Sequence, residues 1–274
     1  MHPVILFRKQ FDDDGEMALA ARYFPVVNYR TEVPTGRVVI GRFACLPYYD
    51  ELAADLANQG SRLINSLAQH AYVANFDYYQ DIEDLTFPTW FNFVDIPTAL
   101  RDSAFVVKGR TNSRKLQWAT HMFAKDFRAA VTLGGELSND PFIGPQGLIV
   151  RQYVPLETLE VALNGMPITN EWRLFFYRDA LLACGYYWGI IDDESLMEKA
   201  RPDFLETGVP FARKAAARLM GKVNFFVIDI AKTVEGEWRV VEVNDGQQSG
   251  RNHYVDANTL YENLVRAVTV APPA

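Results

Sequence analysis

Residues 225–246 read FFVIDIAKTVEGEWRVVEVNDG and predict two antiparallel strands joined by a tight turn. Asp229 falls within an apolar strand, where its carboxylate costs free energy unless a cation or hydrogen-bond donors meet it. With a two-residue turn at Glu235-Gly236, Asp229 lies directly opposite Glu242, and their Cβ atoms are ~5 Å apart. Asn244 stands two positions after Glu242, so it points to the same face of the hairpin.

Two carboxylates and one amide oxygen on one face are ligands that a hard divalent cation prefers. A magnesium ion held by Asp229, Glu242 and Asn244, together with substrate phosphates, would remove the repulsion between the carboxylates. The alternative is that the carboxylates pair with Lys232 or Arg239 of the same hairpin. A register slip of one residue would place Asp229 and Glu242 on opposite faces and remove the site.

The composition is that of an ordinary globular protein, with 49% hydrophobic and 22% charged residues in a chain of 274. The net charge of −7 disfavours nucleic acid as a partner, although the basic stretch 108–115 indicates a phosphate site. The two cysteines, Cys45 and Cys184, are too few for a disulfide framework and lack zinc-ligand spacing. We expect both to be buried hydrophobic side chains in a reducing compartment.

Nothing in the sequence predicts export or membrane insertion. The apolar run 4–7 is short and is followed by Arg8 and Lys9, unlike the core of a signal peptide. No apolar run approaches the ~20 residues that a membrane span needs. A cytoplasmic location is therefore expected, and residues 270–274 read as a frayed tail.

The first hundred residues alternate between short strands and helices, which predicts an α/β layer with some parallel pairing. Predicted strands cover 4–7, 37–41 and 61–65, and predicted helices cover 16–24, 48–58 and 66–74. Between about 77 and 97 the pattern becomes irregular, with acidic residues, prolines and aromatics. We therefore predict an N-terminal α/β domain over residues 1–102.

The remainder, residues 103–274, predicts an α+β domain with subdomains at about 103–150 and 151–270. Strands are predicted at 105–108 and 147–154, a largely helical segment at 120–137, and a helix at 211–220. Hairpins are predicted at 172–188, around the turn 178–180, and at 225–244.

The order of a strand aspartate, an "EVN" strand end and the loop Asp245–Gly250 resembles the metal-binding end of the ATP-grasp fold. The resemblance extends over roughly 103–266 and is greatest to a small ATP-grasp subgroup of bacteria and their phages. It implies two α+β subdomains that hold ATP, preceded by the N-terminal α/β domain. It also implies that Asp229, Glu242 and Asn244 hold magnesium on the ATP phosphates.

Other segments agree with the family in the expected order. Lys108 ends a strand as the lysine that reaches the phosphates, although such a lysine is also typical of a side chain extending to solvent. The loop 109–115 supplies groups that cradle a polyphosphate, unless it is simply a solvated basic loop. Its candidate ligands are Arg110, Asn112, Ser113 and Lys115. The family's loop is richer in glycine, and we expect Lys115 or Arg151 to replace the family's second lysine.

The segment 149–157 resembles the strand that binds the adenine edge, although an ordinary edge strand ended by Pro155 fits as well. The resemblance implies that the backbone of Gln152, Tyr153 and Val154 binds the base and that Glu157 takes the ribose hydroxyls. It further implies that Arg173 lies over the reacting phosphoryl group. Candidate contacts from the N-terminal domain are Gly41-Arg42, Asn65-Ser66 and Gln69-His70, with His70 also typical of a helix-surface histidine.

The resemblance predicts a carboxylate ligase with ATP and Mg²⁺ as cofactors. ATP would phosphorylate a small-molecule or peptide carboxylate, and an amine or other nucleophile would attack the acylphosphate. Lys108 and Arg173 would offset phosphate charge, and Arg251 would clamp the acceptor carboxylate. The alternatives are a phosphotransferase or nucleic-acid end ligase on the same fold, and an inactive nucleotide-binding module. Dinucleotide binding is disfavoured because no GxGxxG motif follows the first strand.

Overall fold

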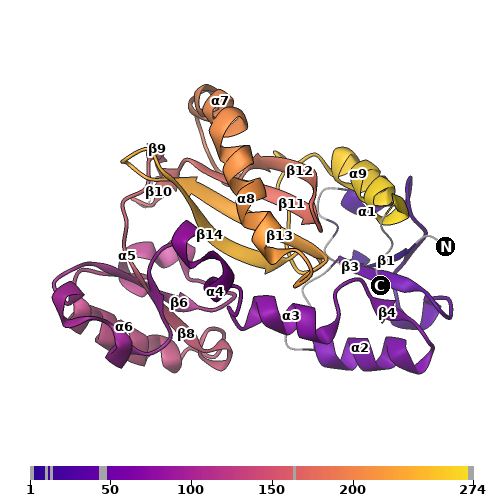
Figure 1. Cartoon of the computed structure of the whole chain (residues 1–274), viewed down its shortest axis with the longest axis horizontal. Helices are drawn as coiled ribbons and strands as arrows, with labels where there is room; N and C mark the ends of the chain where they lie inside the picture. Colours follow the sequence, from indigo (N-terminus) through magenta and orange to yellow (C-terminus); the bar gives the residue numbers. More distant parts are fainter. Residues whose placement is uncertain (1–2, 10–11, 13–14, 43–47, 163–164, 271–274) are drawn as a thin grey trace.

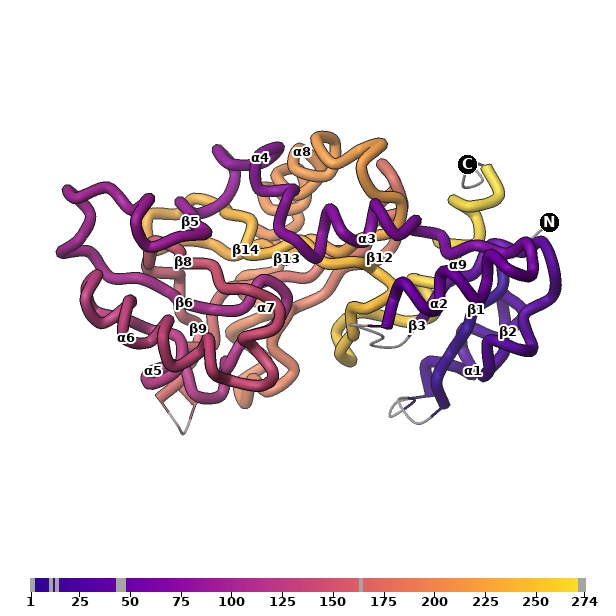
Figure 2. Tube along the Cα trace, turned by 90° about the horizontal axis from the view of Figure 1, so that it is seen from below, coloured from indigo at the N-terminus to yellow at the C-terminus, as the bar shows by residue number. Residues whose placement is uncertain are grey.

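Three four-stranded sheets organise the chain in the computed structural model, which describes residues 3–9, 12, 15–42, 48–162 and 165–270. The central sheet lies between the other two, which occupy the two ends of the elongated molecule (Figures 1 and 2). The predictions for Cys45 and for the tail 271–274 fall outside the described residues. Cys184 is a free, partly buried cysteine.

The N-terminal sheet is parallel and has the order β2-β1-β3-β4. Its strands are β1 Val4–Phe7, β2 Val26–Val27, β3 Val38–Arg42 and β4 Arg62–Leu63, with helices α1 Glu16–Ala20, α2 Tyr49–Asn58 and α3 Leu67–Ala74. All four residues of β1 are buried, as expected of a parallel strand covered on both faces. Helix α3 begins at Ser66, which forms a capping box with Gln69. The predicted α/β layer is confirmed.

The second sheet is antiparallel, with the order β5-β8-β6-β7. Its strands are β5 Thr89–Trp90, β6 Phe105–Gly109, β7 Phe123–Ala124 and β8 Leu148–Gln152. The segment predicted as largely helical over 120–137 is interrupted, because β7 separates α5 Trp118–His121 from α6 Phe127–Ser138. Residues 123–124 pair with β6, and Asp126 then caps α6 by accepting from the amide of Ala129.

The central sheet has the antiparallel order β12-β11-β13-β14. Its strands are β11 Glu171–Tyr177, β12 Ala180–Tyr186, β13 Phe225–Lys232 and β14 Trp238–Asp245, so both predicted hairpins are confirmed. Helix α8 (Val209–Leu219) packs on the face of Phe226 and Ile228. Helix α9 (Ala257–Val270) packs on the opposite face, against Phe225 and Val227, as strand alternation requires (Figure 1).

The smaller elements lie around these sheets. They are α4 Tyr79–Ile82, the hairpin of β9 Thr158–Val161 and β10 Pro167–Thr169, and α7 Glu194–Asp203. Strand β5 precedes the boundary predicted at 102/103, yet it pairs with β8. The domain limits therefore stay a prediction. Among the described residues, no helix combines the length and apolarity that a membrane crossing demands.

The β13–β14 hairpin pairs Asp229 with Glu242, as predicted, but the predicted two-residue turn is wrong. The amide of Thr233 donates to the carbonyl of Glu237, so the loop contains three residues, 234–236. This longer loop shifts the pairing by one residue up to Ile230. A β-bulge at Val241 then inserts an extra residue and restores the predicted register.

Candidate active site

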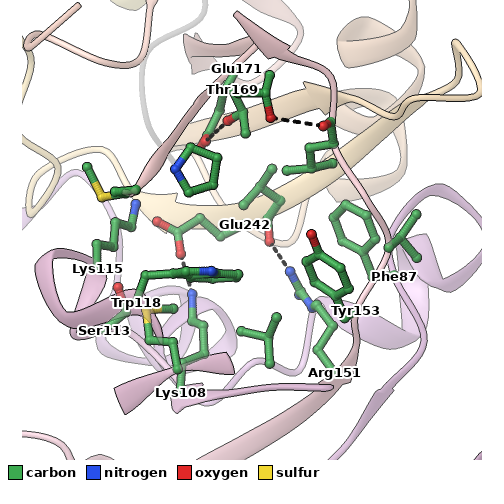
Figure 3. Close-up of a pocket in the computed structure, with 18 of the residues that line it drawn as sticks. Phe87, Lys108, Ser113, Lys115, Trp118, Arg151, Tyr153, Thr169, Glu171 and Glu242 are labelled. Carbon is green, nitrogen blue, oxygen red and sulfur yellow. Dashed lines mark hydrogen bonds and ion pairs between the residues drawn. The ribbon is translucent and has the colours of Figure 1, made fainter. Parts of the chain in front are cut away.

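A cleft lies between the second sheet and the central sheet (Figure 3). Strands β6 and β8 supply Lys108 and Arg151, and β11 and β14 supply Glu171 and Glu242. The apolar part of the wall would accommodate a planar, weakly polar group such as a nucleobase. Its side chains include Phe87, Val106, Trp118, Met122, Tyr153, Leu156, Met166 and Val241.

A polar cleft continues from this pocket. It is lined by Thr111, Asn112, Ser113, Arg114, Lys115, Leu116, Gln117, Tyr187 and Glu242, and it shares Ser113, Lys115 and Glu242 with the apolar part. The loop after β6 therefore contributes hydroxyl, amide and ammonium groups to one wall. Such groups bind phosphate oxygens.

The carboxylate of Glu242 is met by two donors from different sheets. Lys108 Nζ lies 2.5 Å from Oε2, and Asn244 Nδ2 donates to Oε1 at 3.0 Å. Burial alone would raise the pKa of Glu242, but Lys108 and Lys115 outweigh burial and hold that pKa well below its usual range. Glu242 is therefore a carboxylate at neutral pH.

Asp229 is paired with Arg173 in a bidentate contact. Arg173 Nε donates to Oδ1 at 2.8 Å and Nη2 donates to Oδ2 at 2.7 Å, while Nη1 donates to the carbonyl of Gly250 at 2.6 Å. The cations that neutralise the two carboxylates are therefore Arg173 and Lys108. Lys232 and Arg239, the alternatives within the hairpin, pair with Asp203 and Glu237 instead.

The donor set at this end of β13 and β14 fits a magnesium ion. Asp229 and Glu242 are directly opposed, and Asn244 lies beside Glu242 with its Oδ1 unbonded within the described residues. Those residues contain no cluster of three or more His, Cys, Asp or Glu side chains that would hold a metal by themselves. Two carboxylates and an amide suit magnesium, which takes few protein ligands and completes its shell with water and phosphate.

Lys115 reaches across the cleft to the central sheet. Its Nζ donates to the hydroxyl of Tyr187 and lies 4.2 Å from the centre of that ring. Burial alone would lower the pKa of Lys115, but Tyr187, Glu242 and Glu171 raise it above its usual value. Lys115 therefore stays protonated inside the cleft.

Arg151 is buried between the N-terminal segment and β14. Its Nη1 donates to the carbonyl of Val241 at 2.6 Å and its Nε to Thr89 Oγ1 at 3.2 Å. Its guanidinium lies 5.6 and 5.2 Å from the ring centres of Phe76 and Phe87. Nη2 has no partner within the described chain, and Arg151 lines the pocket, so a bound acceptor atom would satisfy that donor.

The structure brings together most of the predicted nucleotide ligands but not all of them. Gln152, Tyr153 and Val154 line the pocket. Arg110 instead donates to the carbonyl of Asn75 and lies over the Phe91 ring. Glu157 accepts from Asn170 Nδ2 at 2.9 Å and is not part of the pocket wall. The ligand roles of Arg110 and Glu157 stay predictions.

Arg251 and the N-terminal candidates lie away from the cleft walls. Arg251 Nε is 3.2 Å from Glu16 Oε2 in a buried ion pair, so its role as a substrate clamp stays a prediction. Arg42 donates to the carbonyls of Gly246 and Ser249 and also pairs with Glu16. These contacts tie the N-terminal sheet to the loop that follows Asn244.

The N-terminal contacts at β4 and α3 are structural in the same way. Asn65 Nδ2 donates to Asp245 Oδ1 at 2.8 Å, and His70 Nδ1 lies 3.0 Å from Asp245 Oδ2. His70 is buried and stacks on Tyr49 at 3.8 Å between ring centres, so the helix-surface interpretation of this histidine is wrong.

Glu171 and Tyr187 were not among the predicted site residues. Glu171 lines the pocket, where burial and the nearby carboxylates Asp229 and Glu242 raise its pKa to about 7 despite Lys115. Strand alternation places Glu171 on the face of Arg173, and that pattern was visible in the sequence. Tyr187 lies beyond the strand end, and no sequence signal marks it.

Solved structures with the same architecture carry the ATP-grasp fold. D-cycloserine synthetase DcsG aligns with a TM-score of 0.58 at 11% identity, covering 97% of this chain and 100% of that one. A RiPP-associated ATP-grasp ligase of Chryseobacterium gregarium, in complex with ADP and a leader and core peptide, gives 0.56 at 10% identity, with 100% and 98% coverage. The ATP-grasp ligase PsnB, complexed with a phosphomimetic variant of its minimal precursor, Mg and ADP, gives 0.52 at 12%, with 98% and 99% coverage.

The profile of an ATP-grasp domain, family 3 of its clade, matches residues 97–264. The chain therefore belongs to this family of ATP-grasp domains. Nothing among curated protein sequences matches it.

Proposed function

We propose that this protein is an ATP- and magnesium-dependent ligase that activates a carboxylate as an acylphosphate and joins it to an amine or another nucleophile. The observation that carries the proposal is the continuous cleft. An apolar pocket leads into a polar end that holds Lys115, and Lys108 reaches Glu242 where the two parts meet. Membership of the ATP-grasp family supports ATP as the ligand.

The residues have distinct roles in this proposal. The backbone at 152–154 binds the adenine edge, and the amide of Val154 has no partner within the described residues. Lys108, Lys115 and Arg151 offset phosphate charge, and Arg173 lies beside the reacting phosphoryl group. The loop ligands Asn112 and Ser113 contact phosphate oxygens.

Asp229, Glu242 and Asn244 would hold magnesium, which supplies charge neutralisation on the phosphates when bound. An oxygen of the acceptor carboxylate attacks the γ-phosphorus and ADP departs. The nucleophile then attacks the acyl carbon, and phosphate leaves with the electrons of the broken C–O bond. The protein positions the reactants and neutralises charge, so no nucleophilic side chain is needed.

The acceptor is proposed to be a small-molecule or peptide carboxylate. Two structural neighbours were solved with peptides, one with a leader and core peptide and one with a precursor variant. These peptides belong to those proteins, and they suggest peptide carboxylates as the first acceptors to test here.

Calorimetry with ATP in the presence and absence of magnesium tests the nucleotide site, and product analysis with pooled peptides and amines tests the reaction. We expect magnesium-dependent binding and release of ADP and phosphate. Glu242→Gln should weaken magnesium-dependent binding by roughly tenfold or more, because a charged ligand is lost. The control is Glu237→Gln, an exposed residue of the same hairpin that pairs with Arg239.

Three results would contradict this proposal in different ways. Full magnesium-dependent binding by Glu242→Gln would overturn the assigned metal site. Formation of AMP would indicate nucleotidyl transfer, and binding without turnover would indicate an inactive nucleotide-binding module.

A further inference from the structure

Tyr187 follows β12 immediately and lines the polar cleft together with the loop 111–117. Its main chain is held at two points of the central sheet region. Its amide donates to the carbonyl of Glu171 at 2.9 Å, and its carbonyl accepts from Asn252 Nδ2 at 2.7 Å. The ring is therefore anchored on one wall of the cleft, while Lys115 comes from the other.

Two cations of the cleft contact this one ring. Lys115 Nζ donates to the hydroxyl and lies 4.2 Å from the ring centre, and the guanidinium carbon of Arg173 lies 4.8 Å from the same centre. The negative face of an aromatic ring attracts cations at these distances. Tyr187 therefore links the loop lysine to the arginine of β11.

Lysine has a long, flexible side chain, and holding its ammonium in one place costs conformational entropy. A fixed acceptor across the cleft offsets this cost before a ligand arrives. The ammonium has three donors, so a bond to Tyr187 leaves two for phosphate oxygens. We propose that Tyr187 is a positioning residue, which holds Lys115 and Arg173 at the polar end of the cleft and thereby sets the affinity for the polyphosphate part of the nucleotide.

This inference rests on the proposed nucleotide site, and its test separates the two. The affinities of a non-hydrolysable ATP analogue with magnesium, and of adenosine, are measured by calorimetry for the wild type, Tyr187→Phe and Tyr187→Leu. Tyr187→Phe keeps the ring and should weaken analogue binding about fivefold, the effect of one lost hydrogen bond. Tyr187→Leu also loses the ring and should weaken it about 30-fold. Adenosine affinity and Tm should stay at the wild-type values.

Two further variants sharpen the result. Tyr254→Phe is the matched control, since its hydroxyl donates to Glu194 at 2.9 Å and it lies outside the walls of both clefts. It should bind both ligands as the wild type does. In a Lys115→Met background, Tyr187→Phe should cause no further loss of analogue affinity, because its hydrogen-bonding partner is gone.

The outcomes are distinguishable. A wild-type protein that fails to bind the analogue with magnesium overturns the proposed function itself. A wild type that binds, with both Tyr187 variants equal to it, overturns the positioning role alone. Equal losses for adenosine and the analogue would also overturn it, because they would indicate a merely structural role for the ring.

Discussion

Arg173 on β11 and Asp229 on β13 form a bidentate ion pair across directly opposed strand positions, at 2.8 and 2.7 Å. The Asp229 side chain is fully buried, and the Arg173 side chain is 16% exposed. The pair lies at the end of the central sheet that faces the cleft. It joins a proposed metal ligand directly to a proposed phosphate-binding arginine.

Removal of one partner of this pair should be costly. Asp229→Asn keeps the shape of the side chain but leaves the guanidinium of Arg173 buried beside a neutral group. We expect the free energy of unfolding to fall by about 3 kcal/mol, measured by urea denaturation. The double variant Asp229→Asn/Arg173→Met should recover part of this loss. An unchanged stability of Asp229→Asn would mean that the pair contributes nothing to the fold.

The carboxyl of Glu171 should make stability depend on pH. Its pKa is raised to about 7 from 4.5 in the unfolded chain. The folded state therefore binds the proton more tightly, and this contribution is fully present below pH 4.5 and lost as pH rises through 7. Compared with Glu171→Gln, the wild type should lose up to about 3 kcal/mol of stability between pH 4.5 and 8.

Urea denaturation of both proteins at several pH values measures this difference, since the other titrating groups largely cancel. Parallel stability curves for the wild type and Glu171→Gln would refute the raised pKa.

Gly185 should not tolerate a side chain. It lies opposite Arg173 in β12, and an added Cβ would lie 2.2 Å from the carbonyl oxygen of Tyr254 and 2.8 Å from the amide of Val255. Gly185→Ala must displace backbone, and we expect a loss of about 2 kcal/mol or more in the free energy of unfolding. Gly135→Ala is the control, because a Cβ there meets nothing within 4 Å and alanine favours the helix. It should stabilise the protein by about 0.5 kcal/mol, and a loss at Gly135 equal to that at Gly185 would refute the steric argument.

The pairing of Asp229 with Glu242 followed from the sequence although the turn was assigned wrongly. The prediction omitted one loop residue and one bulge residue, and these two errors cancel at Asp229. Neither feature has a strong local signal, because a bulge depends on how the strand packs rather than on its own residues. The shared face of Glu242 and Asn244 required only strand alternation.

The partners of the carboxylates did not follow from the sequence. Lys108 and Glu242 are 134 residues apart, and the contact exists because the second sheet lies over the end of the central sheet. Arg173 and Asp229 are 56 residues apart and meet through the register of β11 and β13. Hairpin neighbours such as Lys232 were closer in sequence but pair elsewhere.

The sequence by itself determined which residues share a strand face and in what order the motifs follow, because alternation and turn chemistry act over a few residues. Tertiary structure decided which cation meets which carboxylate, that Arg42 and Arg251 face Glu16, and that Tyr187 meets Lys115. These contacts arise only when separate sheets pack, since a buried charge selects its partner from whatever the packing brings within reach.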